Sequence, residues 1–243
     1  MDQSANITAS MKEARTICYR ELSFFVDKGV FYPGEKSSCG SHFFTDKLLE
    51  QEPEGSMIEI GCGSGLTGLA LTKLKNLERL TAADASDAAV QCTERNSVRL
   101  GIAEKVAAIQ SNVFDAIPET RANIIYWNTP WLYLSRNRKI TRGFDPCMYD
   151  QGYAHLNTFI RDSRKFLRAD GRRFLGSGRG ANTRLMWDMC KQNGCEPSLV
   201  AEMRVEGQQT LALYELVTPT NRTCVQLPSE GVPCADPQTH LKL

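Results

Sequence analysis

Three closely spaced glycines constrain this chain more than any other feature of its sequence. The segment Glu59-Ile60-Gly61-Cys62-Gly63-Ser64-Gly65 follows an apolar run at residues 57–60 and precedes an amphipathic run at residues 66–75. Glycines allow a sharp turn and let a ligand approach the backbone, while the start of a helix offers unpaired N–H groups. The segment therefore predicts a ligand-binding loop between a strand and a helix, with a tight turn that binds nothing as the alternative.

The rest of the chain alternates short apolar runs with amphipathic ones. Strands are expected at residues 57–60, 80–83, 106–110, 123–127 and 173–175, helices at 66–75, 87–100, 155–167 and 182–192, and a hairpin at 199–205 and 210–217. Asp170-Gly171 is expected to end the third of these helices. This alternation is typical of an α/β sheet that is mostly parallel. The first and fourth strands should be neighbours at the point where the strand order reverses, and ligands of such sheets gather there.

Three regions are expected along the chain. Residues 1–53 are predicted to be a mainly helical segment through which the substrate enters, with helices over 1–30 and 40–52. Residues 54–217 form the predicted α/β domain. Residues 218–243, rich in proline and polar side chains, are predicted to be a loosely held extension.

Composition narrows the class of protein. Apolar residues make up 42% and charged residues 23% of the chain, and the net charge is +1, so no strong overall field attracts nucleic acid or a membrane surface. Nine cysteines without a CxxC pair favour free thiols. A zinc site from Cys190, Cys195, Cys224 and Cys234 has the wrong spacing, so no metal is expected. With neither a signal peptide nor a long apolar run, we expect a cytoplasmic protein.

Two acids next to the glycine loop indicate the kind of ligand. The spacing is G-x-G-x-G rather than the G-x-G-x-x-G of dinucleotide sites, and Glu59 would repel a pyrophosphate. The α-ammonium group of S-adenosylmethionine would instead be attracted by Glu59. Asp84, which lies 25 positions later, ends the second expected strand, where a carboxylate can accept from both ribose hydroxyls. Its alternative role is to cap the helix that begins near Asp87.

With this loop, Asp84 and Asn96, residues 30–217 resemble the class I S-adenosylmethionine-dependent methyltransferases. Val30-Phe31-Tyr32-Pro33-Gly34-Glu35-Lys36-Ser37 resembles the V-Y-x-P-x-E-D-T segment of HemK-type enzymes, and Asn128-Thr129-Pro130-Trp131 resembles their N-P-P-Y motif. That motif marks protein-glutamine methyltransferases and nucleobase amino methyltransferases. The resemblance implies a Rossmann-like seven-stranded sheet with an antiparallel C-terminal hairpin and helices on both faces. Thr129 and Trp131 depart from the motif.

The resemblance also implies roles for individual residues. The residues expected to bind S-adenosylmethionine are Glu59, Gly61, Cys62, Gly63, Gly65, Asp84, Ala85, Asn112, Val113 and Asn128. Asn112 stands where the family has an adenine-binding acid, and its side-chain oxygen can still accept from the adenine amino group. Asn128 and Trp131 are the expected catalytic residues, and Tyr32, Pro130, Trp131 and Tyr133 are expected to bind the substrate. The alternatives are that Asn128 caps a strand and that Trp131 belongs to the core.

The predicted reaction follows from the chemistry of methyl transfer. The leaving group is a neutral thioether, so the enzyme must supply alignment and a free lone pair rather than an acid. Asn128 would accept from the target N–H, and Trp131 would orient a planar group. We therefore expect N-methylation of an amide or amine nitrogen in a protein glutamine or a small molecule. The alternatives are a nucleobase amino methyltransferase acting on RNA or DNA, and a cofactor-binding scaffold without turnover. The oligomeric state is left open.

Overall fold

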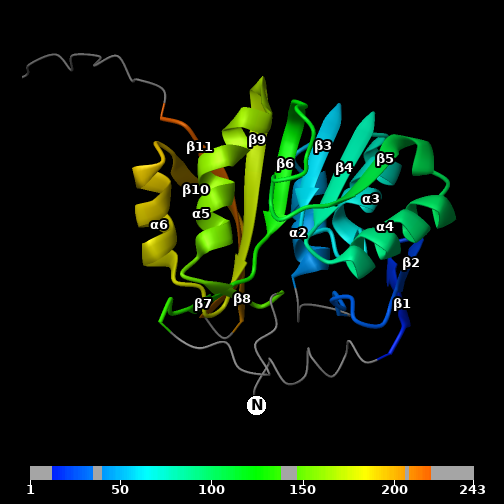
Figure 1. Ribbon diagram of the computed structural model, residues 1–243, viewed down its shortest axis with the longest axis horizontal. Helices are drawn as coiled ribbons and strands as arrows, with labels where there is room; N and C mark the ends of the chain where they lie inside the picture. The colour runs from blue at the N-terminus through cyan, green and yellow to red at the C-terminus, as the bar shows by residue number, and fades with distance from the viewer. Residues whose placement is uncertain (1–12, 35–39, 138–146, 206–207, 220–243) are drawn as a thin grey trace, which may run out of the picture.

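The computed structural model describes residues 13–34, 40–137, 147–205 and 208–219 (Figure 1). A seven-stranded sheet with the strand order β10-β11-β9-β6-β3-β4-β5 forms the centre. The strands are β3 (Ser56–Ile60), β4 (Arg79–Asp84), β5 (Val106–Gln110), β6 (Ala122–Asn128), β9 (Leu167–Gly178), β10 (Glu196–Val205) and β11 (Gln208–Val217). Only β11 runs against the others, since it pairs antiparallel with both β9 and β10. The α/β fold with an antiparallel C-terminal hairpin is confirmed.

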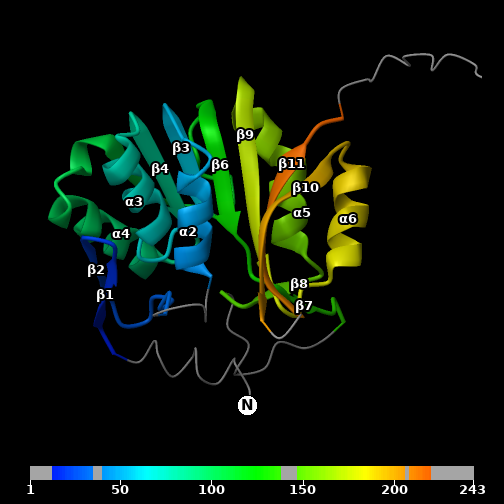
Figure 2. The ribbon, with the colours of Figure 1, turned by 180° about the vertical axis from the view of Figure 1, so that it is seen from behind.

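Helices cover both faces of the sheet (Figures 1 and 2). They are α2 (Ser41–Leu49), α3 (Leu66–Lys75), α4 (Asp87–Arg99), α5 (Ala154–Asp162) and α6 (Thr183–Gln192). Successive residues of a strand point to opposite faces. Accordingly, Met57 packs with α2, α3 and α4 in one core cluster, whereas Ile58 packs with α5 and α6 in another.

The first and fourth strands expected from the sequence, β3 and β6, are neighbours. They pair in parallel, with Glu59 opposite Tyr126 and Ile60 opposite Trp127. Their carboxyl ends therefore lie side by side, which brings the glycine loop after β3 next to the Asn128 segment at the end of β6. This pairing is what places the functional site.

The N-terminal helix predicted over residues 1–30 is wrong for the part that the structure describes. β1 (Arg15–Tyr19) and β2 (Leu22–Val26) form an antiparallel hairpin instead. Ile17 and Tyr19 on β1 are buried, and so are the alternate residues of β2, which is the two-residue period of strands. Asn96 of α4 anchors the hairpin, because its side chain both accepts from Phe25 N and donates to Phe25 O. Residues 1–12 lie outside the described part of the chain.

Other boundaries differ as well. The helix predicted over 155–167 ends at Asp162, and a single 3-10 turn, η2 (Ser163–Phe166), leads into β9. Asp170-Gly171, expected to stop that helix, lies within β9 near an irregularity in its pairing with β6. A second 3-10 turn, η1 (Ala103–Lys105), precedes β5. Two short strands that the sequence did not predict, β7 (Leu132–Leu134) and β8 (Tyr149–Gln151), pair in parallel.

Several expectations concern regions that the structure describes only in part. The three-part division of the chain stays a prediction, and residues 220–243 of the expected extension lie outside the described residues, as do Cys224 and Cys234. In the part that is described, no helix is long and apolar enough to cross a membrane. Nor do three or more metal-ligating side chains come together among those residues.

Candidate active site

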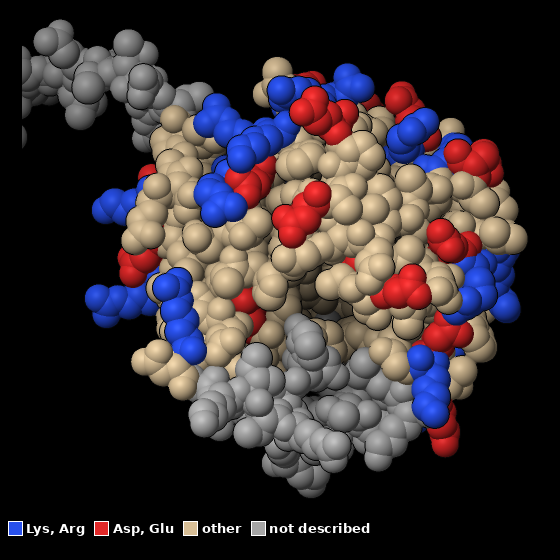
Figure 3. Space-filling view, in the orientation of Figure 1, with Lys and Arg blue, Asp and Glu red and all other residues tan. Residues whose placement is uncertain are grey.

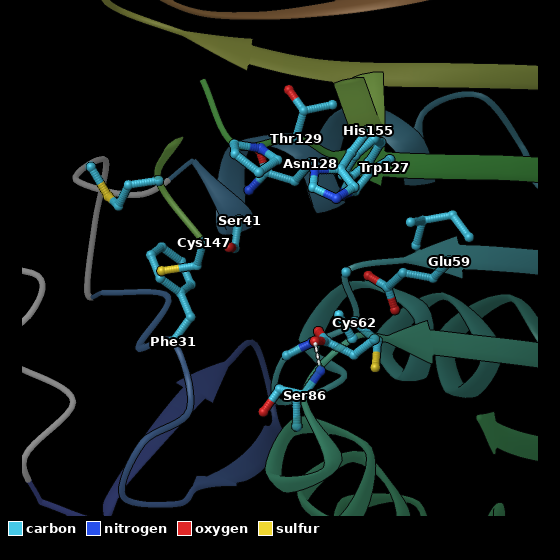
Figure 4. A pocket seen from close by; sticks show the side chains of 18 of the residues that line it. Phe31, Ser41, Glu59, Cys62, Ser86, Trp127, Asn128, Thr129, Cys147 and His155 are labelled. Carbon is cyan, nitrogen blue, oxygen red and sulfur yellow. Dashed lines mark hydrogen bonds between the residues drawn. The ribbon is translucent and has the colours of Figure 1, made fainter. Parts of the chain in front are cut away.

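The glycine loop forms one wall of a cavity of about 920 Å³ at the carboxyl ends of the strands (Figure 4). Gly61, Gly63 and Gly65 have φ angles of 64°, 56° and 77°, in the left-handed region where side chains are rare. At Gly61 a Cβ would also lie 2.8 Å from Nε1 of Trp127. The loop is thus held in a conformation that needs glycine and leaves its backbone open to a ligand.

Asp84 joins this loop to the end of β4. Its Oδ2 accepts from Gly63 N at 3.0 Å, and its Oδ1 accepts from Ser86 N at 2.9 Å. A carboxylate has about four acceptor positions, so capacity for ribose hydroxyls remains. Burial raises the pKa of this carboxyl above its usual value of 3.8. The residue at the N-cap of α4 is Ser86, and the bonds of Asp84 shape the loop rather than cap the helix in the usual way.

Glu59 lies on the wall of the cavity and is only 4% exposed. Its Oε2 accepts from Gly68 N at 3.0 Å, in the first turn of α3. A Cβ at Gly68 would come within 2.4 Å of the same oxygen, so the helix backbone approaches the carboxyl closely. Burial, followed by the nearby charge of Asp84, raises the pKa of Glu59 to about 8, although the bond from Gly68 opposes the shift. A buried acid of this kind suits a cationic group such as an α-ammonium.

Asn128 and Trp131 meet at the end of β6. The indole Nε1 of Trp131 donates to Asn128 Oδ1 at 3.0 Å. Thr129, which replaces the first proline of the motif, donates from its hydroxyl to Gly176 O on β9 at 3.2 Å. Tyr153 Oη donates to Trp131 O at 2.7 Å. The segment that resembles N-P-P-Y is therefore anchored to β9 and to the start of α5, with Asn128 on the cavity wall.

A fourth group of cavity residues follows β5. Ser111, Asn112 and Val113 line this end. Asn112 Nδ2 donates to Asp115 Oδ2 at 3.2 Å, which leaves the amide oxygen of Asn112 available to accept. This arrangement fits the adenine-binding role that the resemblance assigned to Asn112.

Most of the residues expected at the site come together, and some do not. Glu59, Gly61, Cys62, Gly63, Asp84, Ala85, Asn112, Val113, Asn128, Pro130 and Trp131 all line the cavity. Gly65 stands at the N-cap of α3 instead. Neither Tyr32 nor Tyr133 is among the lining residues: the Tyr32 ring lies 5.4 Å from the Arg15 guanidinium, and Tyr133 packs edge-on against Tyr153.

The cavity also contains residues to which the sequence assigned no individual role. Phe31, Ser41, Trp127, Met148 and Arg179 line it. Trp127 had a signal, because it stands directly before Asn128 at the end of β6, and in the structure its indole approaches Gly61. Met148 had none, since it reaches the cavity only through the unpredicted pairing of β7 with β8.

His155 is a further lining residue, and the sequence indicated only that it begins a helix. Its Nδ1 lies 3.1 Å from Oδ1 of Asp150, a carboxylate that is fully buried. Asp150 also accepts from the backbone N–H groups of His155 and Leu156 at the start of α5. The hydrogen bond to Asp150 raises the pKa of His155 above its usual 6.5, while partial burial opposes the shift.

Comparison with known proteins agrees with this geometry. A model of the "Methyltransferase small domain" family matches residues 21–143. The Release factor glutamine methyltransferase of Rhodopirellula baltica is 27% identical over 143 residues, which are 55% of this chain and 48% of that protein. The Ribosomal RNA large subunit methyltransferase G of Vibrio campbellii is 30% identical over 101 residues, 41% of this chain and 26% of that protein. The chain thus spans half or less of the length of these relatives.

Solved structures with the same fold include the T. Thermophilus 16S rRNA N2 G1207 methyltransferase, in complex with AdoMet and guanosine. Its TM-score is 0.62 at 16% identity, over 85% of this chain and 50% of that one. The ribosomal protein L11 methylase of Lactobacillus delbrueckii subsp. bulgaricus has a TM-score of 0.59 at 14% identity, over 85% and 100% of the two chains. Such low identities show the fold alone. Because the family model matches half of its residues, the chain belongs to the methyltransferase small domain family, which agrees with the enzyme class expected from the sequence.

Proposed function

We propose that this protein transfers a methyl group from S-adenosylmethionine to an amide or amine nitrogen, in a protein glutamine or a small molecule. The observation that carries the proposal is the position of Asn128. It ends β6 directly beside the glycine loop of β3, and its side chain faces the same cavity. A cofactor held by the glycine loop would present its methyl group towards the end of β6.

The proposed cofactor site has complementary chemistry at each end. Glu59 would face the α-ammonium group, and Asp84 would accept from the ribose hydroxyls. Backbone groups around Gly61 would contact the amino-acid part, and Asn112 would accept from the adenine amino group. The cavity volume of about 920 Å³ lies near the upper end of the ~300–1,000 Å³ range of ligand pockets. That leaves room for a compact acceptor group beside the cofactor.

The protein's own residues would act mainly by alignment. The bound cofactor supplies an electrophilic methyl group on a sulfonium. Asn128 would accept a hydrogen bond from the target N–H, which increases electron density on the nitrogen as the new bond forms. The methylated nitrogen would then lose this proton to water, because the neutral Asn128 amide cannot keep it. The apolar side chains of Phe31 and Trp131 would exclude water from the acceptor. No residue needs to protonate the leaving group, because a thioether leaves as a neutral molecule.

A nucleobase amino group is the second candidate acceptor. Two observations favour it: several similar proteins are named as ribosomal RNA methyltransferases, and Asn128 would suit an exocyclic amino group equally well. Against it, the net charge is +1, and acidic and basic side chains are interspersed over the described part of the face shown in Figure 3. A long nucleic acid is usually bound by a continuous basic surface.

Label transfer distinguishes these candidates. The purified protein would be incubated with tritium-labelled S-adenosylmethionine and a cell extract, which is then divided into protein, nucleic acid and small-molecule pools. Label in the protein or small-molecule pool, lost with Asn128→Ala, supports the proposal. Nuclease-sensitive label would favour the nucleobase alternative. Binding of the cofactor without any transfer would favour a scaffold that does not catalyse.

A further inference from the structure

The hydrogen bond between Trp131 and Asn128 determines how the Asn128 amide is oriented. An indole N–H can only donate, so the amide atom 3.0 Å away must be the oxygen and not the nitrogen. Asn128 Nδ2 makes no hydrogen bond within the described part of the chain. One lone pair of the oxygen is occupied, and the other lone pair and both amide protons remain for a ligand.

The indole ring is itself held in place by its neighbours. Gly178 on β9 lies against the ring face, and a Cβ there would come within 2.2 Å of Trp131 Cε3. Phe44 of α2 meets the ring edge-on, with 6.5 Å between the ring centroids. At the backbone, Tyr153 donates to Trp131 O. With Gly178 against a face, Phe44 packed nearly perpendicular to the ring and the backbone carbonyl bound by Tyr153, the ring has little freedom to rotate away from Asn128.

We propose that Trp131 is a positioning residue, which acts on methyl transfer by fixing the Asn128 amide rather than by stacking on the acceptor. The inference rests on the proposed role of Asn128. The residue that the N-P-P-Y motif has here, tyrosine, lacks a ring N–H, so this chain has a device that the motif does not require. Without the indole bond, the amide is free to rotate and to present its oxygen or its nitrogen to the target group.

The two roles of Trp131 predict different outcomes for Trp131→Phe. Phenylalanine keeps a flat ring but loses the N–H. If stacking were the role, turnover and acceptor affinity would both be largely retained. If positioning is the role, turnover at saturating acceptor should fall roughly fivefold, as for the loss of one ordinary hydrogen bond, and the acceptor KM should change little. Trp187→Phe is the matched control, because Trp187 lies on α6 against Tyr214 and outside the cavity.

Nuclear magnetic resonance tests the hydrogen bond without any substrate. The chain has three tryptophans, so ¹⁵N-labelled protein gives three indole signals, which Trp131→Phe and Trp187→Phe assign. Asn128→Asp provides a stronger, charged acceptor and should move the Trp131 indole proton downfield, whereas Asn128→Ala should move it upfield. The Trp187 signal should stay in place. A Trp131 signal whose chemical shift stays the same in both Asn128 variants would overturn the proposal.

Gly178→Ala gives a second variant that leaves both partners intact. The structure assigns Gly178 no positive φ, so alanine suits the backbone, but its methyl group would collide with the Trp131 ring. Gly178→Ala should shift the Trp131 indole signal. It should also lower the rate of methyl transfer into the pool that carries the label by about the same factor as Trp131→Phe. Normal turnover in both variants would refute the positioning role. If the wild-type protein transfers no label at all, the proposed function fails and the positioning role fails with it, whereas the indole shifts still show whether Trp131 donates to Asn128.

Discussion

Glu59 should make cofactor binding depend on pH. In the free protein its buried carboxyl has a pKa of about 8, so it is mostly protonated at neutral pH. A cofactor or S-adenosylhomocysteine that places its ammonium group beside it would favour the ionised form. Binding should therefore release a proton from Glu59, and affinity should increase as pH rises towards 8.

The magnitude follows from the fraction of Glu59 that is already ionised. If the bound pKa lies well below the range studied, the affinity for S-adenosylhomocysteine should increase roughly 25-fold between about pH 6 and about pH 7.5. At about pH 7, binding should release about 0.9 proton. Isothermal titration in buffers of different ionisation enthalpy measures both quantities.

Two variants isolate the contribution of Glu59. Glu59→Gln keeps an oxygen that can accept from Gly68 N but cannot ionise, so its affinity should be nearly independent of pH in this range. Glu50→Gln is the matched control, since Glu50 is an exposed acid paired with Lys47. Wild-type binding that neither releases a proton nor depends on pH would refute the reasoning, as would an unchanged pH dependence in Glu59→Gln.

The same carboxyl should make the free energy of unfolding decrease as pH rises, whereas it makes the affinity for the cofactor increase. Between the usual pKa of 4.5 and about 8, the folded protein holds a proton that the unfolded chain releases, so stability decreases as pH rises. Glu59→Gln should therefore be more stable than wild type at pH 7 without cofactor, by up to about 3 kcal/mol. Denaturant unfolding of the free protein checks the sign.

Three further predictions concern the glycine loop, the first turn of α3 and the start of α5. Asp84→Ala should weaken S-adenosylhomocysteine binding by about 1.5–3 kcal/mol in calorimetry, since hydrogen bonds to a charged group are lost; unchanged affinity would leave Asp84 with only its role in shaping the loop. His155→Gln should lower the melting temperature most below about pH 6.5, because the stabilisation from a raised histidine pKa is complete there and is lost as pH rises through the folded value; an equal loss up to about pH 9 would show that the ion pair with Asp150 does not matter. Gly68→Ala should cost about 1–3 kcal/mol in denaturant unfolding, because its Cβ would press on the Glu59 carboxyl, and wild-type stability would show that the helix shifts easily.

The glycine loop and the succession of strands and helices along the chain could be predicted from the sequence, because both depend on local features. The Gly61 loop needs φ angles that only glycine adopts readily, and the strand and helix runs differ in their period. The helix predicted from residue 66 to 75 matches α3, and the strand predicted from 106 to 110 matches β5. Such signals need no knowledge of distant parts of the chain.

The predictions for short segments were wrong or absent where contacts with distant parts of the chain outweigh the local conformational preference. β1 and β2 have only five residues each, too few to separate a two-residue period from a loose helical one. They are strands because they pair with each other and because Asn96 of α4 forms a hydrogen bond with the backbone of Phe25 in β2. β7 and β8 exist only because they pair with each other across 14 intervening residues.

The sequence by itself determined the type of ligand-binding loop at Gly61, the acids Glu59 and Asp84 that accompany it, and the presence of the Asn128 amide. Only the tertiary structure decided which side chains share the cavity and how burial changes their pKa values. Burial is a property of the assembled layers, so the raised pKa of Glu59 could not be predicted from its neighbours in the chain. The bond from Trp131 to Asn128 likewise depends on Gly178 of β9, about 50 positions away, where the missing Cβ lets the indole ring lie against the strand.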